Sequence, residues 1–158
     1  MINVNIELCH NDAIVPYKRE EDGCYDIFPA FDEEYIEIKP RESKLIGTGI
    51  KTAFSSEFVL IIGERGSIGS KGIACRCGVV DSGYRGEIFV CLQNNSDKTV
   101  VIAKYPNDFN NKKLIVLDYS DAIAQFKFER VNKVNYEIVE DIDEFGSTRG
   151  EDCLGSTN

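Results

Sequence analysis

The ten residues at the end of the chain bring one arginine together with closely spaced glycines and two hydroxyl groups: Arg149-Gly150-Glu151-Asp152-Cys153-Leu154-Gly155-Ser156-Thr157-Asn158. Glycines let backbone N–H groups approach phosphate oxygens, hydroxyls add donors, and an arginine fork matches phosphate geometry. A P-loop is excluded, because that motif needs a lysine after its second glycine, a preceding strand and a following helix. The segment alone fits a disordered polar tail as well as a flap that closes over a polyphosphate, and the other segments of the chain favour the flap.

The densest group of chemically useful residues lies between Gly78 and Ile88. It reads Gly78-Val79-Val80-Asp81-Ser82-Gly83-Tyr84-Arg85-Gly86-Glu87-Ile88, which predicts two apolar strand ends joined by a glycine-rich hairpin. Asp81, next to two valines that we expect to be buried, could hold a water molecule as a general base. Tyr84 offers a flat face for a planar or sugar ring. A turn-stabilising aspartate and a strand-edge tyrosine are the structural alternative.

Three further segments carry polar groups beside apolar strands. Glu64–Gly72 joins Arg65 to glycines and hydroxyls, which suits either polyphosphate contact or a solvated turn before a short helix. Asp26 could face a magnesium ion through water or be purely structural. Gln125, inside an apolar strand, needs a hydrogen-bond partner that either the backbone or a ligand could provide.

These residues need a β-rich body to position them. Short runs rich in Val, Ile, Phe and Tyr, bounded by turn residues, predict an all-β sandwich or barrel-like fold. Tyr105–Lys113 is typical of an exposed loop, and Ser67–Gly72 predicts a short helical turn. The expected strands are Ile2–Leu8, Tyr35–Ile38, Lys44–Ile50, Phe58–Gly63, Glu87–Leu92, Thr99–Lys104, Leu114–Leu117, Ile123–Val131 and Val134–Val139.

Length and charge limit the possible partners. A chain of 158 residues fits one domain, and its net charge of −9 disfavours nucleic-acid polymers and anionic membranes. A polyanionic ligand must therefore meet a local cluster of cations.

The longest apolar run, Phe58–Ile62, is too short to cross a membrane, and the first residues lack an export signal, so we expect a cytoplasmic protein. The acidic run Glu140–Glu144 predicts a core over residues 1–139 and a mobile arm over residues 140–158.

The six cysteines have no regular spacing, so we expect reduced and mostly buried thiols rather than a disulfide framework. Cys75 and Cys77 have no second pair near them in the sequence, and the single histidine, His10, is remote. A zinc site would lack its ligands.

The order of these segments resembles the five short motifs of the homotrimeric deoxyuridine triphosphatase (dUTPase) family, from about residue 23 to the end. Gly78–Glu87 matches the third motif, Gly-Val-Ile-Asp-x-x-Tyr-x-Gly-x, most specifically. Tyr25–Ile27 resembles the first motif, Arg65–Ser67 with Lys71 the second, Ile123–Gln125 the fourth, and Arg149–Asn158 the fifth.

The resemblance implies a jelly-roll-like (β-clip) subunit, three of which form a homotrimer with active sites at the interfaces and a mobile arm that closes a neighbour's site. It implies that Asp81 activates the water that attacks the α-phosphorus of dUTP, giving dUMP and pyrophosphate with Mg²⁺. That reaction limits uracil in DNA and supplies dUMP for dTMP synthesis. Asp26 would support the metal through water. The substrate-binding residues that the resemblance implies are Arg65, Gly66, Ser67, Gly78, Val80, Tyr84, Glu87, Ile88, Gln125, Arg149, Gly150, Leu154, Gly155, Ser156 and Thr157.

The chain departs from the family pattern at several positions. Gly23-Cys24 stands where Ala-Gly is usual, and Gly66 occupies a usual serine position. Leu154 replaces a phenylalanine that would stack on uracil, at a cost of about 1 kcal/mol. Glu151 and Asp152 add negative charge beside the phosphates.

Two other functions fit the same scaffold. A dCTP deaminase would need a glutamate five residues after the last glycine of the third motif, where this chain has Cys91. The second is a regulatory protein whose bound nucleotide acts as a switch for a protein partner. Binding of dUTP without turnover would favour that function.

Overall fold

The computed structural model describes residues 1–151, and almost all of its regular structure is β-strand. In chain order the elements are β1 (Asn5–Leu8), β2 (Tyr25–Ile27), β3 (Tyr35–Ile38), β4 (Ser43–Gly47), β5 (Ile50–Ala53), β6 (Phe58–Gly63), α1 (Gly66–Gly69), β7 (Ile73–Arg76), β8 (Val79–Val80), β9 (Phe89–Asn94), β10 (Thr99–Ala103), the 3₁₀ turn η1 (Pro106–Asp108), β11 (Leu114–Asp118), β12 (Ala124–Arg130) and the 3₁₀ turn η2 (Asp143–Phe145). The expected all-β fold is confirmed.

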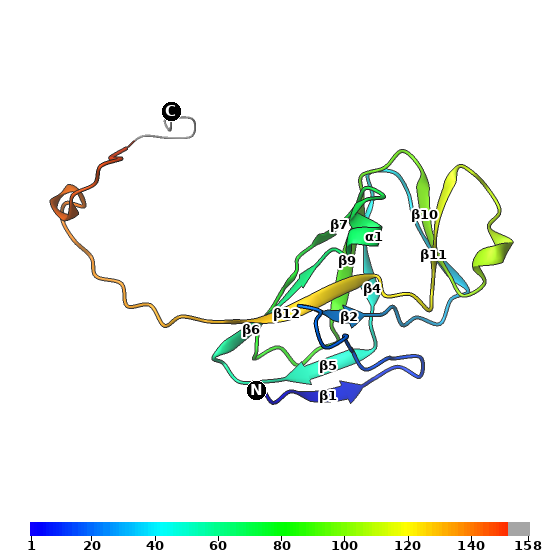
Figure 1. Ribbon diagram of the computed structural model, residues 1–158, viewed down its shortest axis with the longest axis horizontal. Helices are drawn as coiled ribbons and strands as arrows, with labels where there is room; N and C mark the ends of the chain where they lie inside the picture. The colour runs from blue at the N-terminus through cyan, green and yellow to red at the C-terminus, as the bar shows by residue number, and fades with distance from the viewer. Residues whose placement is uncertain (152–158) are drawn as a thin grey trace.

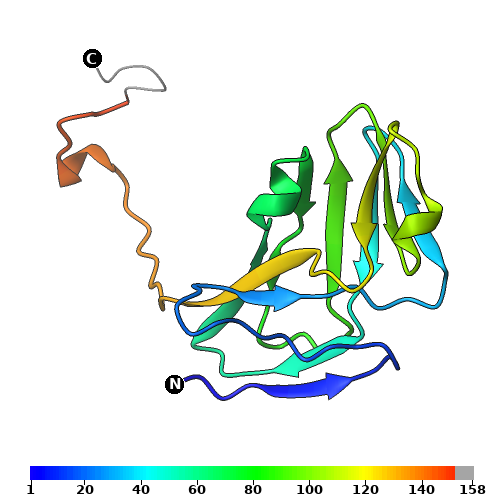
Figure 2. The ribbon, with the colours of Figure 1, turned by 45° about the vertical axis from the view of Figure 1, so that its right-hand side comes forward.

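The strands form small sheets that enclose one core (Figures 1 and 2). One sheet has the order β2-β12-β6-β8, a second β4-β9-β7, a third β11-β10-β3, and β1 pairs with β5. Most pairs are antiparallel, whereas β10 and β11 run parallel. The first of these sheets carries the segments that the sequence singled out for chemistry.

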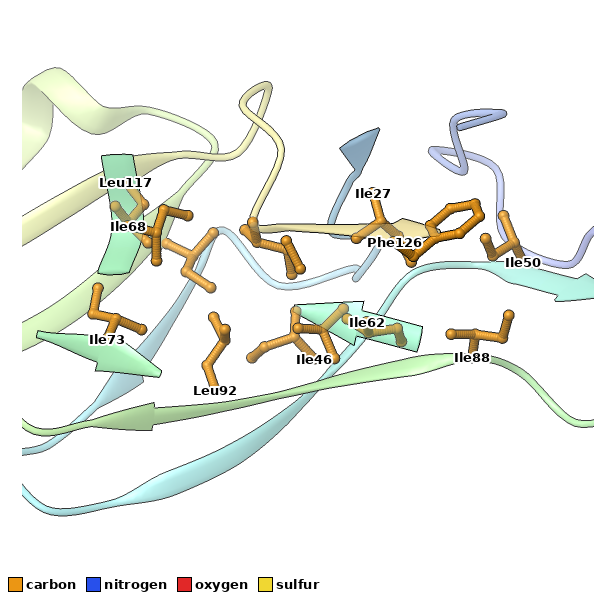
Figure 3. Packing of buried hydrophobic residues seen from close by; sticks show 14 of the residues in the cluster. Ile27, Ile46, Ile50, Ile62, Ile68, Ile73, Ile88, Leu92, Leu117 and Phe126 are labelled. Carbon is orange, nitrogen blue, oxygen red and sulfur yellow. The ribbon is translucent and has the colours of Figure 1, made fainter. Parts of the chain in front are cut away.

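Isoleucine dominates the core between these sheets. Alternate residues of β6 and β9 are buried, among them Leu60, Ile62 and Leu92. Figure 3 shows Ile62, Phe126 and Ile46 facing one another between the layers. Each fully buried side chain of this size contributes about 1.5–3 kcal/mol, so the alternation fixes which face of each strand points inward.

Two expected strands differ from the structure. Lys44–Ile50 is interrupted between β4 and β5, where Gly49 has a φ of +65°. The Gly49 N–H donates to the Glu87 carboxylate at 2.9 Å, which fixes this bend. The prediction of a strand over Val134–Val139 is wrong: those residues are exposed and pair with no sheet. Apolar alternation alone does not make a strand when no edge is available to pair with it.

The segment from Gly78 to Ile88 is not a hairpin. β8 pairs with β6, whereas β9 pairs with β4 and β7, so the segment crosses from one sheet to another. Val79 is also 66% exposed, contrary to the expectation that it is buried. Gly78 is required at the crossing, because a Cβ there would lie 2.3 Å from the carbonyl oxygen of Ile62.

The packed body ends with β12 at Arg130. The Val131 N–H still donates to the Glu57 carbonyl oxygen at 2.8 Å. Residues 132–151 run away from the body (Figures 1 and 2), and the apolar side chains of Val134, Tyr136 and Ile138 are exposed. The division into a core over residues 1–139 and an arm over residues 140–158 remains a prediction. Within residues 1–151, no helix is long and apolar enough to span a membrane.

The five cysteines in this part of the chain are free, as expected, but they are less buried than expected. Cys9 and Cys77 are exposed, and Cys24, Cys75 and Cys91 are partly buried. Burial raises the pKa of the Cys75 thiol to about 12, so that thiol stays protonated at neutral pH.

We expect Gly78→Ala to lower the free energy of unfolding by about 1–3 kcal/mol, because the new methyl group must displace the Ile62 carbonyl. The matched control is Gly83→Ala in the same segment, where nothing lies within 4 Å of the added carbon, so a change of less than about 0.5 kcal/mol is expected. Urea denaturation at one fixed protein concentration measures both. Equal midpoints for the two variants would contradict the close approach.

Candidate active site

Strand β12 brings residues from three distant segments to one end of a sheet. Gln125 in β12 lies opposite Asp26 of β2 on one side and opposite Gly63 of β6 on the other. The chain leaving Gly63 continues directly into Glu64, Arg65 and α1. The strand register therefore places the first, second and fourth sequence motifs side by side.

An ion pair joins two of these motifs. The Arg65 Nε lies 3.0 Å from Asp26 Oδ1, and the side chains are 30% and 28% exposed. Arg65 Nη1 also donates to the carbonyl oxygen of Ala122 at 2.9 Å. The contacts with the Asp26 carboxylate and the Ala122 carbonyl fix the position of the Arg65 guanidinium at the edge of the site.

Gln125 has the partner that a polar residue in a strand requires. Its Nε2 donates to the carbonyl oxygen of Glu64 at 2.8 Å, which uses one of its two amide hydrogens. Ile68 of α1 is buried and anchors this helical turn, whereas Gly66 and Ser67 are exposed at its start. The first N–H groups of a helix have no intrahelical partners, so the backbone N–H groups of Gly66 and Ser67 can act as donors in the pocket that Gln125 also lines.

These residues line a polar pocket of about 600 Å³. That volume is in the range of small-molecule sites. The loop before β2 forms the other wall and contributes Lys18 and Arg19, which the sequence analysis did not single out. The sequence feature that could have indicated them is a pair of adjacent basic residues shortly before the first motif. The lining residues are Tyr17, Lys18, Arg19, Asp22, Gly23, Cys24, Asp26, Arg65, Gly66, Ser67 and Gln125.

In the described part of the chain, the loop that carries Asp81 is stabilised by its own internal contacts and not by the pocket residues. Tyr84 Oη donates to the carbonyl oxygen of Glu87 at 3.0 Å, and the Tyr84 ring lies where a Cβ on Gly86 would be. Arg85, another residue that sequence reasoning missed, donates to the carbonyl oxygens of Ser82 and Tyr84 at 2.7 and 2.9 Å. The segment is therefore a rigid loop with its tyrosine ring packed on a glycine.

The base of this loop is fixed to the core. Ile88 is buried, and its N–H donates to the carbonyl oxygen of Ile50 at 2.9 Å. The Glu87 carboxylate holds the backbone of Gly49. The Asp81 side chain, in contrast, is exposed and has no hydrogen-bond or ion-pair partner within residues 1–151.

Asp81 and the pocket lie at opposite ends of β6. Val80 pairs with Leu60, three residues before Gly63, and β8 runs antiparallel to β6. Asp81 is one residue further from Gly63, so at about 3.3 Å per strand residue it lies about 13 Å along the strand direction from the row that contains Gln125. The predicted site residues form two groups within one chain, with Val80, Asp81, Tyr84, Glu87 and Ile88 apart from the pocket.

The carboxy-terminal predictions are only partly within the described residues. The backbone N–H groups of Arg149 and Gly150 donate to the Ser147 hydroxyl at 3.1 and 3.0 Å. This end of the described chain lies away from β2 and α1 (Figure 1). Leu154, Gly155, Ser156 and Thr157 lie outside the residues that the structure describes. Up to residue 151, no group of three or more His, Cys, Asp or Glu side chains is arranged to hold a metal ion.

Comparison with known proteins agrees with the order of the motifs. The family model described as dUTPase matches residues 10–106, which include the first three motifs. A deoxyuridine 5'-triphosphate nucleotidohydrolase of Nocardia farcinica is 35% identical over 127 residues, 78% of this chain and 67% of the relative. The protein of the same name from Clostridium acetobutylicum is 32% identical over 161 residues, covering 99% of this chain and 97% of its own.

Solved structures share the fold. A dUTPase mutant of Staphylococcus bacteriophage 80alpha with dUpNHpp superposes with a TM-score of 0.78 at 20% identity, over 98% of this chain and 97% of its own. A dUTPase mutant of phage phi11 of S. aureus, which coordinates a structural Mg(II) ion, has a TM-score of 0.71 at 18% identity. The match covers 89% of this chain and 99% of the phage protein. With the family model and these relatives in agreement, the chain belongs to the dUTPase family.

Proposed function

We propose that the protein hydrolyses dUTP to dUMP and pyrophosphate, as the dUTP diphosphatases of its family do, and so limits uracil in DNA and supplies dUMP for dTMP synthesis. The observation that carries this proposal is the polar pocket in which Asp26, Arg65, Ser67 and Gln125 meet from three separate segments. Its hydroxyl, amide and guanidinium donors suit phosphate oxygens.

The complete site requires more than one copy of the chain. We propose a homotrimer in which the loop with Asp81 and Tyr84 faces the pocket of a neighbouring subunit. The separation of these two groups within one chain supports this arrangement. An apolar groove of about 530 Å³, lined in part by Val4, Ile6 and Phe128, also supports it, because an exposed apolar surface of this kind is typical of an interface.

In this scheme Asp81 is the general base. Its exposed, unpartnered carboxylate would take a proton from a water molecule as that water attacks the α-phosphorus of dUTP. The bond from the α-phosphorus to the bridging oxygen breaks, and pyrophosphate leaves. Tyr84 would lie against the deoxyribose and exclude a 2′-hydroxyl. The backbone around Gly78–Val80 and Tyr84–Ile88 would read the uracil edge.

The pocket residues would position the triphosphate. Ser67 and the remaining amide hydrogen of Gln125 would donate to phosphate oxygens, and the arm residues Arg149, Gly155, Ser156 and Thr157 would close over the γ-phosphate. Closing the arm would exclude bulk water.

A magnesium ion fits the Asp26 position through water. Two carboxylate oxygens offer about four acceptor sites, and the contacts with Arg65 leave some of them for metal-bound water. When bound, Mg²⁺ would neutralise charge on the phosphate oxygens.

The direct test is a pyrophosphate-release panel with Mg²⁺ and dUTP, dTTP, dCTP or UTP. We expect turnover of dUTP to exceed that of each other nucleotide by at least about 100-fold, because the loop backbone would reject the thymine methyl and the Tyr84 ring would reject the 2′-hydroxyl. Equal rates across the panel would contradict the uracil and sugar assignments. Binding of dUTP without turnover would favour a regulatory role instead.

Replacing Asp81 with asparagine keeps the side-chain shape but removes the base. We expect kcat for dUTP to fall by at least about 100-fold while the dissociation constant of the nucleotide changes by no more than a few-fold. Asp118→Asn, which lies at the end of β11 outside the pocket, is the control. An unchanged kcat for Asp81→Asn would remove Asp81 as the base.

A further inference from the structure

Five charged side chains line the polar pocket, and four of them neutralise one another. Arg19 Nε lies 3.0 Å from Asp22 Oδ2, and Arg65 Nε lies 3.0 Å from Asp26 Oδ1. Each arginine is therefore already committed to a carboxylate in its own chain. The fifth charged group is the ammonium of Lys18.

Lys18 has only neutral partners. Its Nζ donates to the carbonyl oxygens of Arg19 and Glu20 at 3.1 and 3.0 Å, and it lies 5.7 Å from the centre of the Tyr25 ring. No carboxylate within residues 1–151 is at ion-pair distance from this nitrogen. The pocket lining therefore carries one net positive charge, and that charge is centred on Lys18.

The backbone around Lys18 is anchored rather than loose. The N–H of Asp26 donates to the carbonyl oxygen of Tyr17 at 2.8 Å, which ties the residue before Lys18 to the middle of β2. The Tyr17 ring stacks on Phe28 with 5.3 Å between ring centres, and the Lys18 side chain is half-buried. The Lys18 side chain therefore lines the same pocket as Asp26 and Gln125, which lie opposite each other where β2 and β12 pair.

The Lys18 ammonium is the cation of this pocket that has no carboxylate partner within residues 1–151, so it could bind a polyphosphate. The chain has a net charge of −9, so an anionic ligand needs a local positive group to offset the general repulsion. We propose that Lys18 binds the phosphate chain of the nucleotide directly and supplies the charge that the paired Arg65 does not. This inference rests on the proposed function of the same pocket.

Three variants distinguish an effect of the Lys18 charge on binding from an effect of Lys18 on the structure of its loop. Lys18→Gln keeps an N–H donor for the Arg19 and Glu20 carbonyls but removes the charge, and Lys18→Arg keeps the charge. Lys44→Gln is the matched control, since Lys44 Nζ also donates to a carbonyl oxygen, that of Glu37 at 3.2 Å, but lies on β4 outside the pocket. Isothermal titration with dUMP and with the non-hydrolysable imido analogue of dUTP measures affinity at low and high salt, and thermal unfolding checks that each variant is folded.

We expect Lys18→Gln to weaken binding of the dUTP analogue by about 5- to 10-fold at low salt, and by less than about twofold at 0.5 M salt, because salt screens an exposed ionic contact. Binding of dUMP should change by less than about twofold, since most of the phosphate charge is missing. Lys18→Arg and Lys44→Gln should remain within about twofold of the unaltered protein for both ligands.

Failure of this inference differs from failure of the proposed function. If the unaltered protein hydrolyses dUTP and Lys18→Gln binds the analogue as tightly as Lys44→Gln does, Lys18 makes no phosphate contact. Equal losses for dUMP and for the analogue, independent of salt, would likewise overturn the inference in favour of a role in loop structure. An unaltered protein that neither binds nor hydrolyses dUTP would overturn the proposed function, and the inference with it.

Discussion

The position of β12 between β2 and β6 is the constraint on which the site depends. Its hydrogen-bond register places Gln125 between Asp26 and Gly63, although these residues lie far apart in the sequence. A slip of one residue would turn Gln125 into the core and Phe126 out of it. The burial of Phe126 and its ring contact with Phe128, 5.8 Å between centres, oppose such a slip. Core packing thus fixes the position of the polar groups.

The same sheet also separates the two groups of predicted site residues. Because β8 runs antiparallel to β6, the chain that emerges at Asp81 leads away from the end that carries Arg65. The Glu87 carboxylate and the backbone groups of Ile88 and Gly78 hydrogen-bond to the core, so the loop cannot swing back without breaking these contacts. A rigid loop and a rigid pocket that do not meet within one subunit are explained most simply by assembly.

Much of this architecture could be predicted from the sequence. The alternation in Phe58–Gly63 and the apolar residues around Gln125 indicated strands with defined inner faces, and the structure has β6 and β12 there. The all-β class and the family followed from local patterns and from the order of the motifs. Such features are encoded in neighbouring residues, so they can be read without knowing the tertiary pairing.

What the sequence could not show depends on long-range pairing. Gly78–Ile88 has the composition of a hairpin, but its two ends pair with different sheets, which no local pattern reveals. The apolar alternation in residues 134–139 resembles a strand although no strand edge within residues 1–151 pairs with it. Similarly, the ion pair between Arg65 and Asp26, on which the proposed role of Lys18 rests, joins residues 39 positions apart, and no local pattern predicts it.

In the proposed trimer, one subunit supplies the phosphate pocket and another supplies Asp81. Two variants test it directly: Asp81→Asn, and Ser67→Asp, which puts a negative charge in the pocket at the exposed start of α1, where an acidic residue does not destabilise a helix. Each alone should be inactive toward dUTP. Refolding them together in equal amounts should restore about one quarter of the activity of the unaltered protein, which is the share of intact interfaces in randomly mixed trimers. Activity that stays at the level of the separate variants after mixed assembly would contradict a site shared between subunits.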